Sequence, residues 1–145
     1  MTQVTSQPTK SITIDARGPR FSAGITVVVL ATALATQSAW ILALQGIVFA
    51  IGAFRGPQFT PYAAIFRNVV RPRLKGEVPT EDVRPPQFAQ SVGLLFVLVA
   101  LVGSLTGIGA IFVIATGAAL AAAFLNVAFD FCLGCEIYLL LLRLR

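Results

Sequence analysis

Two long stretches of this chain contain no charged residue, and they limit what it can fold into. No Asp, Glu, Lys or Arg occurs between Arg20 and Arg55, or between Arg84 and Asp130. An apolar stretch of about 18 or more residues with few charges is long enough to cross a membrane as a helix. The chain of 145 residues is only 12% charged and has a mean hydropathy of +0.84. A soluble domain of this length cannot bury so much apolar surface, so the sequence predicts an integral membrane protein.

Each uncharged stretch is too long for a single crossing. As one helix, residues 21–54 would measure about 51 Å, whereas the hydrocarbon core of a bilayer is about 30 Å thick. Thr36, Gln37 and Ser38, followed by the interfacial Trp40, favour a turn in the first stretch. Residues 103–109 (GSLTGIG) favour a turn in the second. We therefore expect four helices, near residues 21–36, 39–54, 90–105 and 108–129.

Four crossings place every charged residue on one side of the membrane. That side holds all 11 Lys and Arg. The positive-inside rule then predicts a multi-pass protein of the plasma (inner) membrane with both termini in the cytoplasm. A three-span topology would put Arg67, Arg71 and Arg73 outside, and we set it aside. We also expect residues 1–39 to be retained rather than cleaved as a signal peptide, because the same residue pattern precedes the second stretch.

That pattern is an internal repeat. Residues 15–24 (DARGPRFSAG) match residues 82–91 (DVRPPQFAQS) as D-x-R-x-P-x-F, at an offset of 67 positions (82 − 15). Both copies precede an uncharged hairpin on the same side, which indicates a parallel repeat about an axis along the membrane normal. The alternative is that these are ordinary capping residues before a helix, and each Asp is placed either to cap or to pair with the Arg two residues on. The hairpins end at Arg55 and Asp130, which we expect to form an ion pair across the axis.

Two further helical segments follow the hairpins. Thr60 and Pro61 favour a helix start, and apolar residues continue at helical spacing from Tyr62 to Val70, until Pro72 ends the helix. The apolar stripe of this short interfacial helix would lie in the membrane boundary or against the ends of the bundle. Each hairpin is also followed by a Tyr and then an Arg five positions on, Tyr62 with Arg67 and Tyr138 with Arg143.

The predicted fold class is therefore all-α: an integral membrane four-helix bundle made of two parallel-repeat hairpins, residues 21–54 and 90–129. The interfacial helix lies in the cytoplasmic loop 55–89, and a C-terminal helical segment lies in the thiol segment 130–145. Together, residues 15–145 would form a single membrane domain that follows a disordered cytoplasmic tail, residues 1–14.

Both cysteines of the chain lie three positions apart after the last hairpin, in FDFCLGCEIY (129–138). We expect a helix to restart there and to put Cys132 at its N-terminus, where free backbone N–H groups stabilise a thiolate. Gly134 would let the backbone bend so that Cys132 and Cys135 can close. The negative neighbours Asp130 and Glu136 raise a thiol pKa, and the sequence has no histidine to act as a base.

Three interpretations of this cysteine pair stay open. In a redox or sulfur-carrying dithiol, Cys132 would be the exposed nucleophile and Cys135 the resolving thiol. The supporting residues would be Asp130, Gly134, Glu136 and Tyr138. Alternatively, the thiols pack inertly, as buried cysteines often do. Zinc needs about four ligands, so a metal site would require two chains to share it, and we expect no metal and no cofactor. A cytoplasmic location argues against a permanent structural disulfide.

Several segments resemble a bacterial integral-membrane family that is described only as domain of unknown function 4395. They are FCLGCEIYLLLLR (131–143), VRPPQFAQ (83–90), FRGPQFTPY (54–62) and VRPRL (70–74). The resemblance covers most of residues 15–145, and its most specific element is F-C-L-G-C-x-x-Y. It implies no established activity. Members of the family tend to be associated with thioredoxin-like proteins and rhodanese-type sulfurtransferases, which implies a cytosolic partner of that kind and a role in reduced-sulfur metabolism.

These observations support three hypotheses, and whether the chain is an enzyme stays open. The first is a membrane-anchored thiol–disulfide or sulfur-relay protein whose basic face, with a formal net charge of +5, docks an acidic partner or a sulfur oxyanion. The docking residues would be Arg67, Arg71, Arg73 and Arg84. The second is a small-anion transporter component, although the spans lack the ionisable residues that usually mark a transport path. The third is a non-catalytic subunit or assembly factor of a membrane complex. We expect contact with the lipid bilayer, a homo-oligomer or a larger membrane complex, and no nucleic-acid partner.

Overall fold

The structure, a computed structural model, describes residues 13–74, 80–129 and 131–144. Its helices are α1 (Arg17–Thr36), α2 (Ala39–Phe54), α3 (Pro61–Ile65), α4 (Arg84–Thr106), α5 (Gly109–Phe129) and α6 (Leu133–Arg143). Short helical turns flank α3: η2 (Pro57–Phe59), η3 (Phe66–Val70) and η4 (Arg71–Arg73). Two short strands are β1 (Thr13–Asp15) and β2 (Thr80–Asp82). The all-α fold class is confirmed, and the two strands are an addition that the sequence did not predict.

Three helices are long and apolar enough to cross a membrane: α1, α4 and α5, with 20, 23 and 21 residues. α2 has 16 residues and is about 24 Å long. α1 and α4 begin earlier than predicted, at Arg17 and Arg84. Pro19 and Pro85 are the reason, because both lie in a first turn whose backbone N–H groups need no intrahelical partner. The chain is thus a small membrane protein by the length and composition of its helices, and a fourth crossing by α2 stays a prediction.

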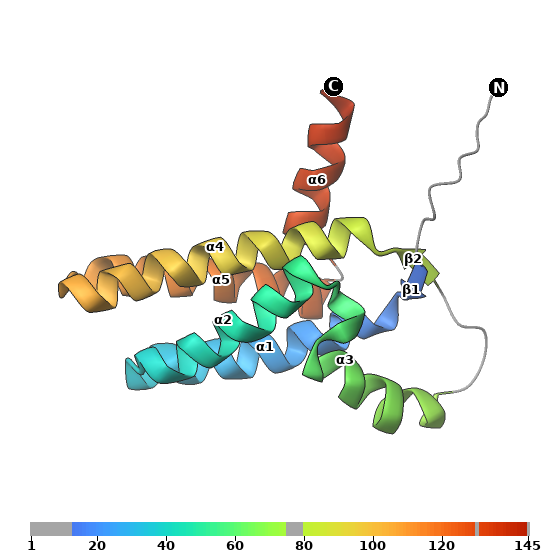
Figure 1. The fold of residues 1–145 in the computed structure, drawn as a ribbon, viewed down its shortest axis with the longest axis horizontal. Helices are drawn as coiled ribbons and strands as arrows, with labels where there is room; N and C mark the ends of the chain where they lie inside the picture. Colours follow the sequence, from blue (N-terminus) through green and yellow to red (C-terminus); the bar gives the residue numbers. More distant parts are fainter. Residues whose placement is uncertain (1–12, 75–79, 130, 145) are drawn as a thin grey trace.

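The turns between these helices fall where the sequence predicted them. Gln37 ends α1 with a left-handed φ of 56°, and the Ser38 hydroxyl caps α2 by accepting the Ile41 N–H at 3.3 Å. Gly107 ends α4 with a φ of 79°, a conformation that costs glycine little. Both turns lie at one end of the bundle, at the left in Figure 1, and the two strands lie at the other end.

The four long helices form a closed ring. α4 packs between α2 and α5, and α1 packs against the same two helices (Figure 1). The centre of the ring is a cluster of buried apolar side chains: Leu30, Ala33, Leu42, Phe49, Val97, Ala100, Phe112, Ala115 and Ala119. The outer face is apolar as well, with Trp40 and Leu105 more than four-fifths exposed at 83% and 86%. Such a surface suits contact with the lipid bilayer.

Glycines allow α2 and α4 to approach closely. A Cβ atom on Gly46 would lie 2.9 Å from Cγ1 of Val97, and one on Gly93 would lie 2.8 Å from the Phe49 ring. Lipid tails give little hydrophobic drive for helix association, so close packing at small residues is a main source of stability.

A two-stranded antiparallel ribbon closes the end of the bundle opposite the turns. Its register pairs Thr13 with Asp82, Ile14 with Glu81 and Asp15 with Thr80. The central pair joins two residues that the repeat makes equivalent, since 14 + 67 = 81. The ribbon is therefore symmetric with respect to the internal repeat.

Each strand leads into a helix through the same hydrogen bonds. Asp15 Oδ1 accepts the backbone N–H of Arg17 at 2.9 Å, and Asp82 Oδ1 accepts that of Arg84 at 2.9 Å. The same carboxylates form ion pairs with the two guanidinium groups, at 2.9 Å and 2.7 Å. The sequence offered capping and pairing as alternatives. Pairing occurs, and each carboxylate also accepts from the N–H of the first helical residue, although the N-cap residues are Ala16 and Val83.

The third helices of the two halves also correspond. α3 packs against α1, and α6 packs against α4. Each has a side-chain cap of the same geometry: Thr60 Oγ1 accepts the Ala63 N–H at 3.2 Å, and Cys132 Sγ accepts the Cys135 N–H at 3.2 Å. Cys132 therefore takes the place in α6 that Thr60 takes in α3.

An aromatic ring follows each cap and packs on the first helix of its own half. Phe66 contacts Phe21 with ring centroids 5.7 Å apart, and Tyr138 contacts Phe88 at 5.5 Å. Both rings come six positions after the cap (66 − 60 and 138 − 132), so Phe66 is the structural counterpart of Tyr138. The sequence repeat matched Tyr62 with Tyr138, which is wrong, because distance from the cap decides which side chain reaches the first helix.

Two boundaries differ from those that the sequence predicted. The expected disordered tail includes Thr13 and Ile14, but both belong to β1, and residues 1–12 lie outside the described residues. The loop expected at residues 55–89 contains β2 and ends earlier, since α4 begins at Arg84.

Candidate functional site

Cys132 and Cys135 are joined by a disulfide at the start of α6, with Cα atoms 5.1 Å apart. Both residues are half-buried. Cys132 is the N-cap residue and has extended backbone angles, φ −87° and ψ 103°, whereas Cys135 lies in the first turn of the helix. The sequence placed Cys132 at or just before this first turn, and the structure agrees.

Gly134 has a different role from the one predicted. It lies inside α6 rather than at a bend, and its φ is not positive. A Cβ atom on Gly134 would lie 2.7 Å from both Cα and Cβ of Ala89. The glycine therefore allows α6 to pack directly against α4, and the extended backbone of Cys132 brings the sulfur atoms together.

The other residues predicted to support the pair are arranged around it. Glu136 is exposed in the first turn of α6, where a negative charge interacts favourably with the helix dipole. Tyr138 packs on Phe88 and anchors the helix to α4. Asp130 lies outside the described residues, so its predicted ion pair with Arg55 stays a prediction. The Arg55 guanidinium lies over the Phe59 ring, 5.5 Å from its centroid.

Cys132 lines a cavity of about 260 Å³ that the sequence did not predict. The cavity extends into the bundle between α1, α4 and α5, beneath the start of α6. Its lining is mostly Ala, Phe and other apolar residues, and none of the described residues that form it is Asp, Glu, Lys or Arg. Thr26, Gln90 and Asn126 provide the polar groups, so the site suits a neutral, largely apolar ligand.

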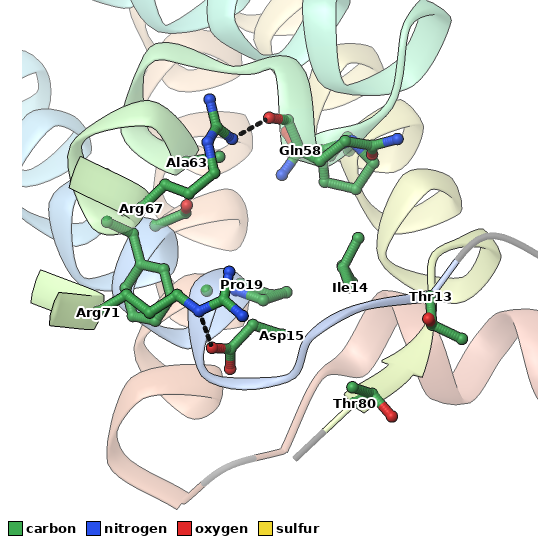
Figure 2. A pocket seen from close by; sticks show the side chains of 14 residues that line it. Thr13, Ile14, Asp15, Pro19, Gln58, Ala63, Arg67, Arg71 and Thr80 are labelled. Carbon is green, nitrogen blue, oxygen red and sulfur yellow. Dashed lines mark hydrogen bonds and ion pairs between the residues drawn. The ribbon is translucent and has the colours of Figure 1, made fainter. Parts of the chain in front are cut away.

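A second cavity, of about 350 Å³, lies under α3 at the ribbon end of the bundle. Figure 2 shows Arg67 and Arg71 on one side of it, with Asp15 and the two strand residues Thr13 and Thr80 around its rim. The Arg67 Nη1 group donates to the Gln58 carbonyl oxygen at 2.9 Å, and Arg71 Nε lies 3.6 Å from Asp15 Oδ2. The two cavities share Pro19 and Gln90 in their linings and therefore adjoin.

The second cavity contains both charges and unpaired acceptors. Hydrogen bonding to Arg17 holds the pKa of Asp15 below its ordinary value, although burial acts in the opposite direction. The carboxylate therefore stays ionised and balances part of the positive charge. Oε1 of Gln58 and Oε1 of Gln90 are buried and accept no hydrogen bond from the described residues. Of the four residues expected to dock a partner, Arg67 and Arg71 line this one cavity. Arg73 is exposed on η4, and Arg84 is paired with Asp82.

A chain of buried polar groups links α3 to the ring. The Tyr62 hydroxyl donates to Gln45 Oε1 at 2.6 Å, and Gln45 Nε2 donates to Thr26 Oγ1 at 3.5 Å. Gln45 is only 1% exposed, and burial raises the pKa of Tyr62. Sequence reasoning did not predict this network, although an amide in the middle of the apolar α2 segment was a signal for it.

No group of three or more His, Cys, Asp or Glu residues within the described parts of the chain is arranged to hold a metal ion.

Comparison with known proteins gives a family and no activity. Neither the curated proteins nor the solved structures include a significant match to the chain. The family described as "Domain of unknown function (DUF4395)" matches residues 14–143, which is nearly the whole chain and includes the last two residues of β1, the whole of β2, α1 to α6 and the cysteine pair. The chain therefore belongs to the DUF4395 family.

Proposed function

We propose that this chain is a membrane-anchored thiol–disulfide protein in which Cys132 and Cys135 alternate between a disulfide and a dithiol. The observation that carries the proposal is the half-buried cysteine pair at the helix N-cap, at the ribbon end of the bundle. With the charged end in the cytoplasm, the pair would meet soluble reductants there, and a disulfide in that compartment is usually transient and functional.

The geometry around Cys132 favours its role as the nucleophile. In the reduced state its sulfur would keep the N-cap position, where the Cys135 N–H now donates to it at 3.2 Å. Free N–H groups and the helix dipole stabilise a thiolate there. Cys135 lies one turn further into the helix and would act as the resolving thiol.

The exchange step balances in two displacements. A partner thiolate attacks Cys132 Sγ, forms a mixed disulfide and releases Cys135 as a thiolate. A second partner thiolate then attacks the partner sulfur of the mixed disulfide and releases Cys132. The partner loses two electrons and becomes a disulfide, and the pair becomes a dithiol after taking up two protons. A sulfur relay would use the same Cys132 thiolate to accept the outer sulfur of a donor persulfide, leaving the donor as a thiolate.

The cavity that contains Arg67 and Arg71 would dock the partner or its substrate. Its two arginines suit an acidic side chain or a small sulfur oxyanion, and its boundary with the cysteine-lined cavity brings such a group toward the pair. A thioredoxin-like or rhodanese-type protein fits this chemistry, with the chain acting alone or within a larger membrane complex.

Two single-cysteine variants test the proposal. In native membranes, Cys135→Ser should trap a mixed disulfide between Cys132 and its partner, whereas Cys132→Ser should not. The partner is then identified by non-reducing electrophoresis and mass spectrometry. After reduction, the wild-type thiols should react with a water-soluble maleimide.

The double variant Cys132→Ser/Cys135→Ser is the control for folding and should keep the thermal unfolding profile of the reduced wild type. If neither single variant captures a partner and the reduced thiols resist alkylation, the pair is structural and the proposal fails. A transporter component or assembly factor would in that case keep its function in the double variant.

A further inference from the structure

The cavity beside Cys132 has the properties of a binding site for a flat, neutral molecule. Ala119 and Ala122 leave the space open, Gly93 makes room for the Phe49 ring, and Phe49 and Phe96 contribute aromatic rings to the lining. Among the described residues, no charged side chain contributes to the wall, so the described lining offers an ionic ligand no counter-charge. A ligand inside the cavity would lie against the wall to which Cys132 belongs.

Two carboxamides supply the hydrogen-bonding capacity of the cavity. Gln90 and Asn126 both line it, and Gln90 Oε1 is buried without a hydrogen-bond partner among the described residues. The Gln90 amide packs against Gly52 on α2, where a Cβ atom would lie 2.7 Å from Oε1, so a change of side-chain rotamer is needed for this oxygen to contact a ligand in the cavity. A carboxamide donates through nitrogen and accepts through oxygen, so it can bind a carbonyl and also the hydroxyl that forms when the carbonyl is reduced.

The cavity is also placed for a ligand that arrives from the bilayer. Most of its lining comes from the N-terminal halves of α1 and α4 and the C-terminal half of α5, three helices that are long and apolar enough to cross a membrane. Phe49 of α2 and the start of α6 complete it. It therefore lies within the bundle near the ribbon end, at the depth where the polar head of a lipid-soluble molecule would meet the start of α6.

We propose that this cavity binds a lipid-soluble quinone that oxidises the reduced cysteine pair, an inference that rests on the function proposed above. Two thiols give up two electrons and two protons when they form the disulfide between Cys132 and Cys135. A quinone accepts two electrons and two protons and becomes a quinol, so the reaction balances without another reactant. Gln90 and Asn126 bind the quinone oxygens in the oxidised state and accept from the quinol hydroxyls in the reduced state.

The test uses the full chain in lipid nanodiscs, reduced with dithiothreitol, freed of reductant and kept anaerobic. Decylubiquinone and menadione are the probes, and quinol formation is followed by absorbance while free thiols are counted by alkylation. The wild type should form one quinol for each disulfide. Cys132→Ser/Cys135→Ser should form no quinol but should still bind a photoreactive quinone, because only one lining residue changes and serine is close to cysteine in size.

Two neighbouring alanines on α5 distinguish the effect of filling the cavity from the general effect of a larger side chain on the helix. Ala122 lines the cavity, whereas Ala121 is exposed and lies outside the lining. Ala122→Leu should raise the quinone KM by about tenfold or more, the equivalent of about 1.4 kcal/mol of binding, and Ala121→Leu should leave it unchanged. Gln90→Leu should also raise the quinone KM, because it removes one of the two carboxamides of the cavity.

The outcomes distinguish this inference from the proposed function. Thiol exchange with a soluble dithiol but no quinone reduction overturns the quinone site and leaves the thiol–disulfide function intact. Equal quinone kinetics in Ala122→Leu and Ala121→Leu place the reaction outside the cavity and also overturn the inference. If the pair reacts with neither a soluble dithiol nor a quinone, both proposals fail.

Discussion

Asp15 connects the start of α1 to the turn that follows α3. Its carboxylate accepts from the backbone and side chain of Arg17, lies 3.6 Å from Arg71 Nε and is only 9% exposed. Asp82 makes the same bonds to Arg84 in the second half, but its side chain is 34% exposed. Asp15 and Asp82 share the same sequence motif but differ in burial. Comparing variants of the two therefore isolates the effect of burial on stability.

We expect Asp15→Asn to destabilise the protein by about 1.5–3 kcal/mol, because it weakens charge-assisted hydrogen bonds at a buried position. Asp82→Asn should cost less, since water competes for its carboxylate. The folded pKa of Asp15 lies below its ordinary value of 3.8, so its contribution is complete above that pH and is lost as the pH falls through the folded pKa. Thermal unfolding in detergent, measured between neutral and acidic pH, checks both points. Equal losses in the two variants would contradict this account.

At the scale of helices, α6 differs from the ring helices because only its first turns are packed. Gly134 and Tyr138 hold these turns against α4, whereas several leucines further along are exposed, including Leu140 at 55%. Figure 1 shows α6 projecting away from the ring at a steep angle to α4. With the ring crossing the bilayer, this direction lies along the membrane surface, where exposed leucines favour the lipid boundary.

Gly134→Ala tests whether this packing controls the cysteine pair. The new methyl group would lie 2.7 Å from the backbone of Ala89, so α6 must shift away from α4. We expect a loss of about 1–3 kcal/mol in stability and faster alkylation of the reduced thiols. Gly117→Ala is the control, because a Cβ atom on that α5 glycine meets nothing within 4 Å. If the alkylation rate is unchanged in Gly134→Ala, the packing of α6 does not control the accessibility of the thiols.

For the whole molecule, the distribution of charged residues predicts the membrane topology. The two turns of the ring lie at the end opposite the ribbon, and the chain around them carries no charged residue. In a cysteine-free background, we expect Thr36→Cys and Ser104→Cys to react with an impermeant maleimide from outside the cell. Arg73→Cys should react only after permeabilisation. Labelling of Arg73→Cys in intact cells would show that the positive-inside assignment is wrong.

The sequence predicted those parts of the fold that depend on local pattern. The break at Thr36–Ser38, the helix of residues 39–54 and the N-terminal place of Cys132 follow from hydropathy and capping within a few residues. The ribbon was not predicted, because three residues such as Thr13–Asp15 are too few to show strand alternation. The cavity beside Cys132 was not predicted either, since it depends on which alanines of α5 face α4, a matter of tertiary packing.

Repeat-equivalent residues face each other at the centre of the ribbon, and this has a consequence for the origin of the two cavities. A half-length chain with one strand and three helices, paired with its own copy, would form the same ribbon across a homodimer axis. Such a dimer would contain two copies of the same cavity, one under the third helix of each chain. Pro19 and Ser22 in the arginine-lined cavity correspond to Pro86 and Ala89 in the cysteine-lined one, by the same offset of 67 (86 − 19 and 89 − 22). Fusion into one chain would free the two copies to diverge, so that one is lined by arginines and the other by Cys132.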